Sequence, residues 1–213
     1  MSAAIDQLAI HHALTRRGKR LEYLTIVWNS MEALVSIVAG VIAGSIALIG
    51  FGLDSVIETS SGAILLWRLG HEHDPERRER AERTALKLVG WSFIALAAYV
   101  SFDAIKALIS REPPDTSIAG IVIAAVSLVV MPLLARAKRK VARGLRSDAM
   151  HADSRQTDIC AYLSAILLGG LGLNALLGWW WADPVAGLCM VPLIAWEGSK
   201  ALRGEKCCDD GCH

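Results

Sequence analysis

The fold is decided by residues 44–58, which read GSIALIGFGLDSVIE. They open a mostly apolar run, 45–69, and a run of roughly 20 or more such residues is long enough to cross a bilayer as a helix. Comparable runs recur along the chain at 22–43, 85–109, 117–136, 157–175 and 183–202. The sequence therefore predicts an all-α membrane protein with six transmembrane helices.

The overall composition agrees with this fold class. The chain has 213 residues, of which 54% are hydrophobic and 20% are charged, and its mean hydropathy is +0.41. Lysine and arginine nearly balance aspartate and glutamate, so the net charge is +1 and no basic field exists to hold nucleic acid. No Ser/His/Asp grouping or phosphate-binding loop is visible, and we therefore expect no enzymatic activity.

Basic residues are concentrated in alternate loops, which predicts the topology. They precede the first span (Arg16, Arg17, Lys19, Arg20), follow the second (Arg77, Arg78, Arg80, Arg83) and follow the fourth (Arg136, Lys138, Arg139, Lys140, Arg143). The positive-inside rule then places both termini in the cytoplasm. We expect a basic N-terminus at 1–20, a six-span domain at 21–204 and a cytoplasmic tail at 205–213, in a multi-pass protein of the inner or plasma membrane.

Two carboxylates lie inside the second predicted span. A charged side chain in the middle of a bilayer costs about 2.5–3.5 kcal/mol on insertion scales, so each one marks a functional site. Asp54 and Glu58 are four residues apart and share one helix face, as two oxygen ligands of one cation would. No basic residue is expected in the middle of a span to neutralise them. The pair therefore predicts a cation site.

The first span adds polar groups at matching depths. Because the first two spans join through a tight hairpin at 43–45, Glu32 lies as far from the turn as Asp54, and Asn29 matches Glu58. Glu32 is then a metal ligand, a partner of a ligand or a proton carrier. A protonated Glu32 bonded to Asn29 or to nearby backbone explains the residue equally well.

The fifth span offers two competing faces. At about 100° per residue, Asp153, Gln156 and Cys160 share one side of the helix, whereas His151 and Asp158 share the opposite side. Only one face can look into the bundle, and the residue pattern leaves the choice open.

Three motifs resemble the cation diffusion facilitator (cation efflux) family: residues 44–58, residues 152–156 (ADSRQ) and residues 178–184 (GWWWADP). The resemblance implies a six-span homodimer that exchanges Zn²⁺ or a related divalent cation for protons. It matches Asp54 and Glu58 to the acidic pair of the second span, and it places Gln156 and Cys160 at the usual histidine and aspartate of the fifth.

The implied ligand set is Asp54, Glu58 and Cys160 with Asp153 or Gln156. Such an oxygen and sulfur shell suits Zn²⁺ or a softer ion better than Mg²⁺ or Ca²⁺. The metal is then the substrate, and no permanently bound cofactor is expected.

Two further clusters are candidate accessory metal sites: His71 with His73, and a tail containing Cys207, Cys208, Cys212 and His213. A solvated loop explains His71 and His73 equally well, and the tail is the stronger signal. Thiols and imidazoles are typical ligands of soft metals. The sequence is expected to be a short family form without the usual C-terminal cytoplasmic domain. The carboxylates inside the bilayer favour metal efflux by alternating access, since a mere anchor gains nothing from their insertion cost. The missing domain is the best argument for the alternative function, a membrane metal sensor or scaffold that binds metal without transporting it.

Overall fold

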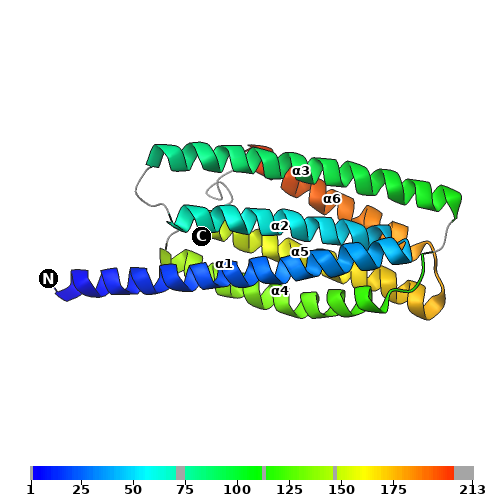
Figure 1. Cartoon of the computed structure of the whole chain (residues 1–213), viewed down its shortest axis with the longest axis horizontal. Helices are drawn as coiled ribbons and strands as arrows, with labels where there is room; N and C mark the ends of the chain where they lie inside the picture. The colour runs from blue at the N-terminus through cyan, green and yellow to red at the C-terminus, as the bar shows by residue number, and fades with distance from the viewer. Residues whose placement is uncertain (1, 71–74, 112–113, 146–147, 204–213) are drawn as a thin grey trace, which may run out of the picture.

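The computed structural model describes residues 2–70, 75–111, 114–145 and 148–203. They form six helices that run along one another as an elongated bundle (Figure 1). The helices are α1 (Ser2–Ala43), α2 (Ile46–Gly70), α3 (Pro75–Ser110), α4 (Ile118–Leu145), α5 (Asp148–Leu177) and α6 (Ala182–Arg203). The predicted His71 and His73 cluster and the cysteine-rich tail lie outside the described residues.

The helices confirm an all-α membrane protein. By length and composition, α1 to α5 each contain a segment apolar enough to cross a membrane. The sixth helix has 22 residues and packs along α3 and α5. Several helices are longer than the predicted spans, because α1 begins at Ser2, α3 begins at Pro75 and α4 continues to Leu145.

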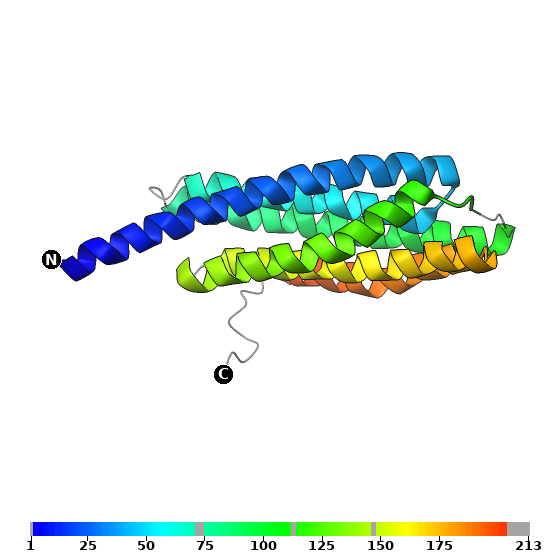
Figure 2. The ribbon, with the colours of Figure 1, turned by 90° about the horizontal axis from the view of Figure 1, so that it is seen from below.

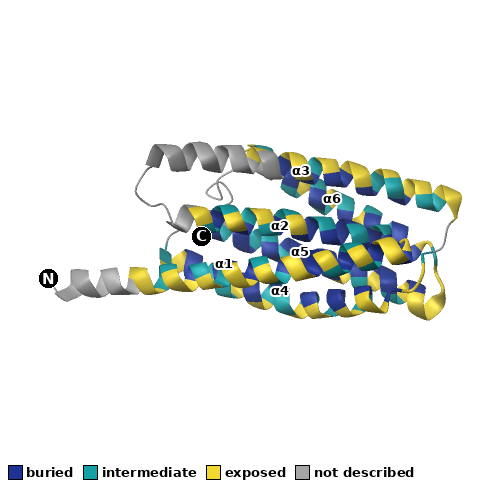
Figure 3. Ribbon diagram, in the orientation of Figure 1, coloured by how far each residue is buried: buried dark blue, intermediate teal, exposed yellow. Residues whose placement is uncertain are grey.

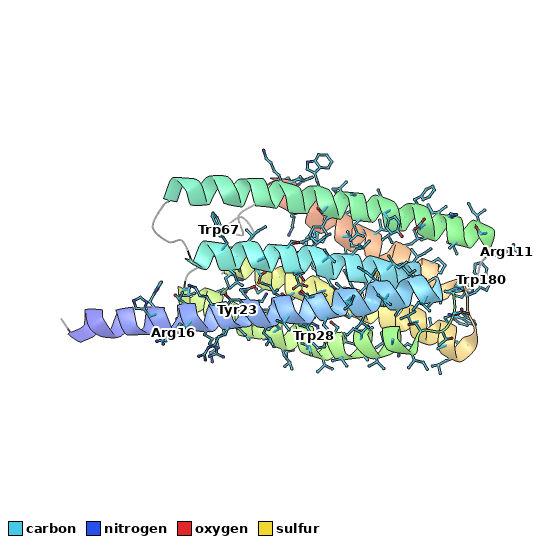
Figure 4. The ribbon with its side chains drawn as sticks, viewed as in Figure 1. Arg16, Tyr23, Trp28, Trp67, Arg111 and Trp180 are labelled. Atoms are coloured by element: carbon cyan, nitrogen blue, oxygen red, sulfur yellow. The ribbon has the colours of Figure 1, made fainter. Side chains whose placement is uncertain are left out.

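The two ends of the bundle differ in chemistry. At the basic end lie the arginine and lysine residues at 16–20, and Arg136, Lys140 and Arg143 of α4. At the tryptophan end lie the α1–α2 turn and residues 179–181, where Trp179 stacks on Trp181. Figure 4 shows Arg16 and Trp67 toward the first end, and Arg111 and Trp180 at the second. Such aromatic belts are typical of membrane–water interfaces.

The α1–α2 hairpin is tight, as the sequence predicts. Gly44 has a φ of 65°, which only glycine adopts readily, and it reverses the chain within two residues. Below the turn the helices nearly touch: a Cβ at Gly52 would lie 3.0 Å from the backbone nitrogen of Ile37. This packing fixes the register of α1 on α2, and with it the relative depth of their polar side chains.

A clamp at the tryptophan end joins α6 to α2. The Ser45 hydroxyl donates to Asp183 Oδ1 at 2.5 Å, and the Ile46 amide donates to Asp183 Oδ2 at 3.0 Å. Asp183 thereby caps the N-terminus of α2, where amide groups otherwise lack partners. The carboxylate is 1% exposed, so water does not substitute for these bonds.

We expect Asp183→Ala to destabilise the bundle by about 3 kcal/mol, because it removes two hydrogen bonds to a buried carboxylate and a helix cap. Thermal unfolding in detergent measures the effect as a lower transition midpoint. Asp115→Ala is the matched control, since that side chain is exposed at the same end. Equal midpoints for the two variants would contradict a stabilising clamp.

The helices α3 and α6 form a close pair on one side of the bundle (Figures 1 and 2). The pair meets at Gly90 and Gly198. A Cβ on Gly90 would lie 3.0 Å from the carbonyl oxygen of Gly198, and a Cβ on Gly198 would lie 3.0 Å from the carbonyl oxygen of Gly90. Small residues of this kind let transmembrane helices pack backbone against backbone.

Candidate metal transport site

A stripe of polar residues runs along the inward face of α1. Its members lie three and four residues apart, which keeps them on one helix face, and each is 0% exposed: Glu22, Thr25, Asn29, Glu32 and Ser36. The stripe extends over about 21 Å at 1.5 Å per residue. Figure 3 shows the complementary exposed face of α1 on the outside of the bundle. The interior of this membrane protein is therefore polar along much of its length.

The centre of the stripe meets α2 and α5 at Glu32. The Ser55 hydroxyl donates to Glu32 Oε2 at 3.2 Å, and the Cys160 sulfur lies 4.0 Å from the same oxygen. Asp54 lies close enough to interact with Cys160 and with the charges of Glu32 and Glu58. The hairpin thus brings Glu32 to the depth of Asp54, as the residue count predicts.

Glu58 accepts a hydrogen bond from Thr157 of α5, a residue that the sequence analysis did not identify as part of the site. The Thr157 hydroxyl donates to Glu58 Oε1 at 2.8 Å, while Glu58 Oε2 is buried without a partner. Thr157 is fully buried, as is Glu58 apart from 1% of its surface. One oxygen of this carboxylate is therefore oriented by α5, and the other is free to accept a cation.

Further polar atoms around this centre are buried without partners. They are both side-chain polar atoms of Asn29, Glu32 Oε1, Ser36 Oγ and Ser127 Oγ. Burying such an atom without a hydrogen bond costs about 1–3 kcal/mol, so several together indicate a place built for a polar ligand. Within the described ranges, no three His, Cys, Asp or Glu side chains converge closely enough to hold an ion as they stand.

Lys138 corrects one prediction. The sequence places it in a loop after a span that ends at 136, and it expects no basic residue inside the bundle. Instead α4 continues, and Lys138 is 0% exposed. Its ammonium nitrogen lies 2.5 Å from Asp153 Oδ2, 3.3 Å from Glu22 Oε2 and 3.4 Å from Thr157 Oγ1. Lys138 lies on the buried, mostly apolar face of α4, whereas the side chains of Arg136 and Lys140 are exposed.

The two faces of α5 are now distinguishable by their surroundings. Asp153 and Cys160 are buried, whereas Asp158 forms a two-pronged ion pair with Arg139 at 2.7 and 3.2 Å on a half-exposed surface. His151 is half-buried, and Gln156 is half-buried with its amide nitrogen lacking a partner. Of the predicted ligands on α5, the structure brings Cys160 beside Glu32 of α1 and pairs Asp153 with Lys138.

Sequence reasoning overlooked four residues near the centre: Glu22, Lys138, Thr157 and Glu197. Glu197 of α6 lies near enough for its charge to interact with that of Asp54. The sequence could have indicated Glu22, because polar residues recur at alternating spacings of three and four from Glu22 to Ser36. It indicated Thr157 more weakly, because Thr157 follows Asp153 by four residues and shares its helix face. Glu197 follows an otherwise apolar stretch of α6 without a pattern that singles it out.

Comparison with known proteins agrees with this architecture. The family model of the cation efflux transmembrane domain matches residues 23–203, which include the second half of α1 and all of α2 to α6. The chain is 26% identical to an uncharacterized transporter of Synechocystis, over 76% of this chain and 54% of the relative. It is 25% identical to a cation-efflux pump of Cronobacter sakazakii, over 91% of this chain and 65% of the relative.

A vertebrate relative, transmembrane protein 163 of Xenopus laevis, is 25% identical over 92% of this chain and 70% of its own length. The chain therefore spans between about half and two thirds of the first two relatives. Since the family model covers most of the chain, from the middle of α1 to the end of α6, this multi-pass integral membrane protein belongs to the cation efflux family.

Proposed function

We propose that the protein exports a divalent metal ion, zinc or a similar transition metal, in exchange for protons. The observation that carries this proposal is the buried polar stripe of α1, which meets two carboxylates and a thiol at its centre. An anchored scaffold or sensor gains nothing from unpartnered polar groups along the inside of its bundle. A path for a hydrated or ligand-bound ion requires them.

Asp54, Glu58 and Cys160 are the proposed ligands, with Glu32 as the fourth. Glu32 is the choice because its carboxylate already lies beside the Cys160 sulfur, whereas Asp153 is paired with Lys138. Gln156 remains an alternative for this position. Metal arrival would draw the four side chains together, and Glu32 and Glu58 each have one carboxylate oxygen without a partner that could bind the ion. Three oxygen ligands and one sulfur ligand suit Zn²⁺ or Cd²⁺.

The same four side chains can couple metal binding to the release of protons. Carboxylates and a thiol bind metal only when deprotonated, so binding releases protons and protonation releases metal. If the site opens alternately to the two faces of the membrane, proton entry from outside expels the ion there. The family resemblance also implies a homodimer, which stays a prediction.

Acid-loaded proteoliposomes test this function. They should take up Zn²⁺ on addition outside, and their lumen should become more alkaline as protons leave, as a trapped pH dye reports. Empty liposomes and vesicles with the Asp54→Ala protein are the controls. Uptake without a lumenal pH change would contradict proton exchange. Stoichiometric binding without uptake would support the sensor or scaffold instead.

The proposed topology places the basic end in the cytoplasm. A cysteine introduced at Pro113 should then react with an impermeant maleimide added to intact cells, while the native tail cysteines should not. Permeabilised cells are the control, because all of these thiols should react in them. If the tail cysteines react in intact cells and the cysteine at position 113 does not, the bundle has the opposite orientation in the membrane.

A further inference from the structure

We propose that Glu22, Lys138 and Asp153 form a latch that closes the cytoplasmic end of the metal path. This inference rests on the proposed function and topology, because they define the metal path and its cytoplasmic end. Its evidence is separate, since none of the three residues belongs to the ligand set proposed above.

The three residues tie three helices together at one point. Lys138 of α4 bonds Glu22 of α1 at 3.3 Å and Asp153 of α5 at 2.5 Å, with exposed fractions of 0%, 0% and 6%. Glu22 also faces α2, where a Cβ at Gly62 would lie 3.4 Å from its Oε2. Lys138 therefore joins α1, α4 and α5, and α2 packs against Glu22 beside it.

The latch lies directly beside the transport site on its basic side. Lys138 is 3.4 Å from Thr157 Oγ1, and that hydroxyl donates to Glu58 Oε1. A single threonine thus connects the ammonium to the carboxylate. Glu22 is also the described member of the α1 stripe nearest the basic end. Any ion that travels between this end and Glu58 along the stripe must pass Lys138.

The arrangement is costly if its purpose is only stability. Buried ion pairs seldom stabilise more than well-packed apolar side chains, because desolvation offsets their attraction. Here two carboxylates share one ammonium, and Glu22 Oε1 and Asp153 Oδ1 remain buried without partners. A contact of this kind, with spare acceptors on both sides of the lysine, is suited to opening and reforming.

Access to the native Cys160 thiol tests the latch. The background protein carries Cys189, Cys207, Cys208 and Cys212 as serine, so Cys160 is the one thiol left, and it is 1% exposed. An impermeant methanethiosulfonate reagent is added to inside-out vesicles without metal, and the labelling rate is measured. The background protein should react slowly, because the latch excludes the reagent from the cytoplasmic side.

The neutral triple variant Glu22→Gln/Lys138→Met/Asp153→Asn removes the latch without leaving an unpaired buried charge. We expect Cys160 labelling to rise about tenfold, as a tenfold larger open population would give. Glu22→Gln alone keeps the remaining pair neutral and should give a smaller rise. Exchanging the charges in the Glu22→Gln protein, by Lys138→Asp/Asp153→Lys, should return labelling to the rate of Glu22→Gln alone.

Arg139→Gln is the matched control, since Arg139 also joins α4 to α5 by an ion pair, but on a half-exposed surface. It should label at the background rate. The proposal is overturned if Cys160 labelling is unchanged in the triple variant and in Glu22→Gln. An equal rise of the labelling rate in Arg139→Gln also overturns it. The outcome is independent of transport: absent Zn²⁺ flux in the parent contradicts the proposed function, whereas these rates decide the latch by themselves.

Discussion

Asp54→Ala is expected to abolish metal flux while the protein stays folded in the membrane. Asp54 is 5% exposed and lies among Glu32, Glu58 and Cys160, so its loss removes an anionic ligand from the centre of the site. Loss of a residue that merely supports a metal ligand costs about 10–100-fold in affinity, and loss of a ligand should cost at least about 100-fold. Zn²⁺ uptake into proteoliposomes measures the effect.

The fold should survive this change because a buried carboxylate is a cost to the bundle, and alanine removes it. Ser60→Ala is the matched control on α2, since its exposed hydroxyl bonds only the carbonyl of Val56. Glu58→Gln should also lose most of its flux, although the amide oxygen still accepts the bond from Thr157. Flux at the parental rate in Asp54→Ala would remove the basis of the proposed site.

The second large effect is expected at Cys160. Cys160→Ser should weaken binding of Cd²⁺ and Zn²⁺ strongly and shift the preference toward harder ions such as Mn²⁺. The reason is that a metal-bound thiol ionises, whereas a serine hydroxyl stays protonated and is a poorer ligand for soft metals. Competition of the three ions for uptake gives the preference directly.

The variants His151→Ala and Asp158→Asn are the comparison on the opposite face of α5. Asp158 pairs with Arg139 on a half-exposed surface, and such pairs contribute about 0–1 kcal/mol. Both variants should therefore transport at nearly the parental rate. Loss of flux in these two with an unaffected Cys160→Ser would move the site to an imidazole and carboxylate pair.

The fold was predictable because apolar length and alternating basic loops are strong local signals. The positions of the helix ends were harder to predict, and Lys138 illustrates the reason. The predicted fourth span ended where charges begin, but the buried face of α4 continues through Leu134, Ala135, Lys138, Val141 and Ala142. A helix does not stop where its outer face becomes polar, so the apolar spacing beyond 136 was the better guide.

The site was predictable where its residues share one helix or one hairpin. Asp54 and Glu58 follow from their spacing, and Glu32 follows from counting back from the turn. Bonds between distant helices are not encoded in that way: Thr157 reaches Glu58 across 99 residues, and Asp183 reaches Ser45 across 138. Which face of α5 turns inward depends on the packing of four helices together, and no single segment carries that information.

The glycine contact between α3 and α6 restricts how this molecule can change shape. Gly90 and Gly198 meet backbone against backbone, and the side chains of Leu202 and Phe93 pack directly on the two glycines, so sliding one helix past the other would push backbone atoms into these side chains. We therefore expect the two helices to move together, as one unit, against the other four. Its fulcrum is the tryptophan end, where Asp183 fastens α6 to α2 and Gly170 of α5 packs against Ala186. The largest displacement of the pair is therefore expected at the opposite, basic end, which the proposed topology places in the cytoplasm.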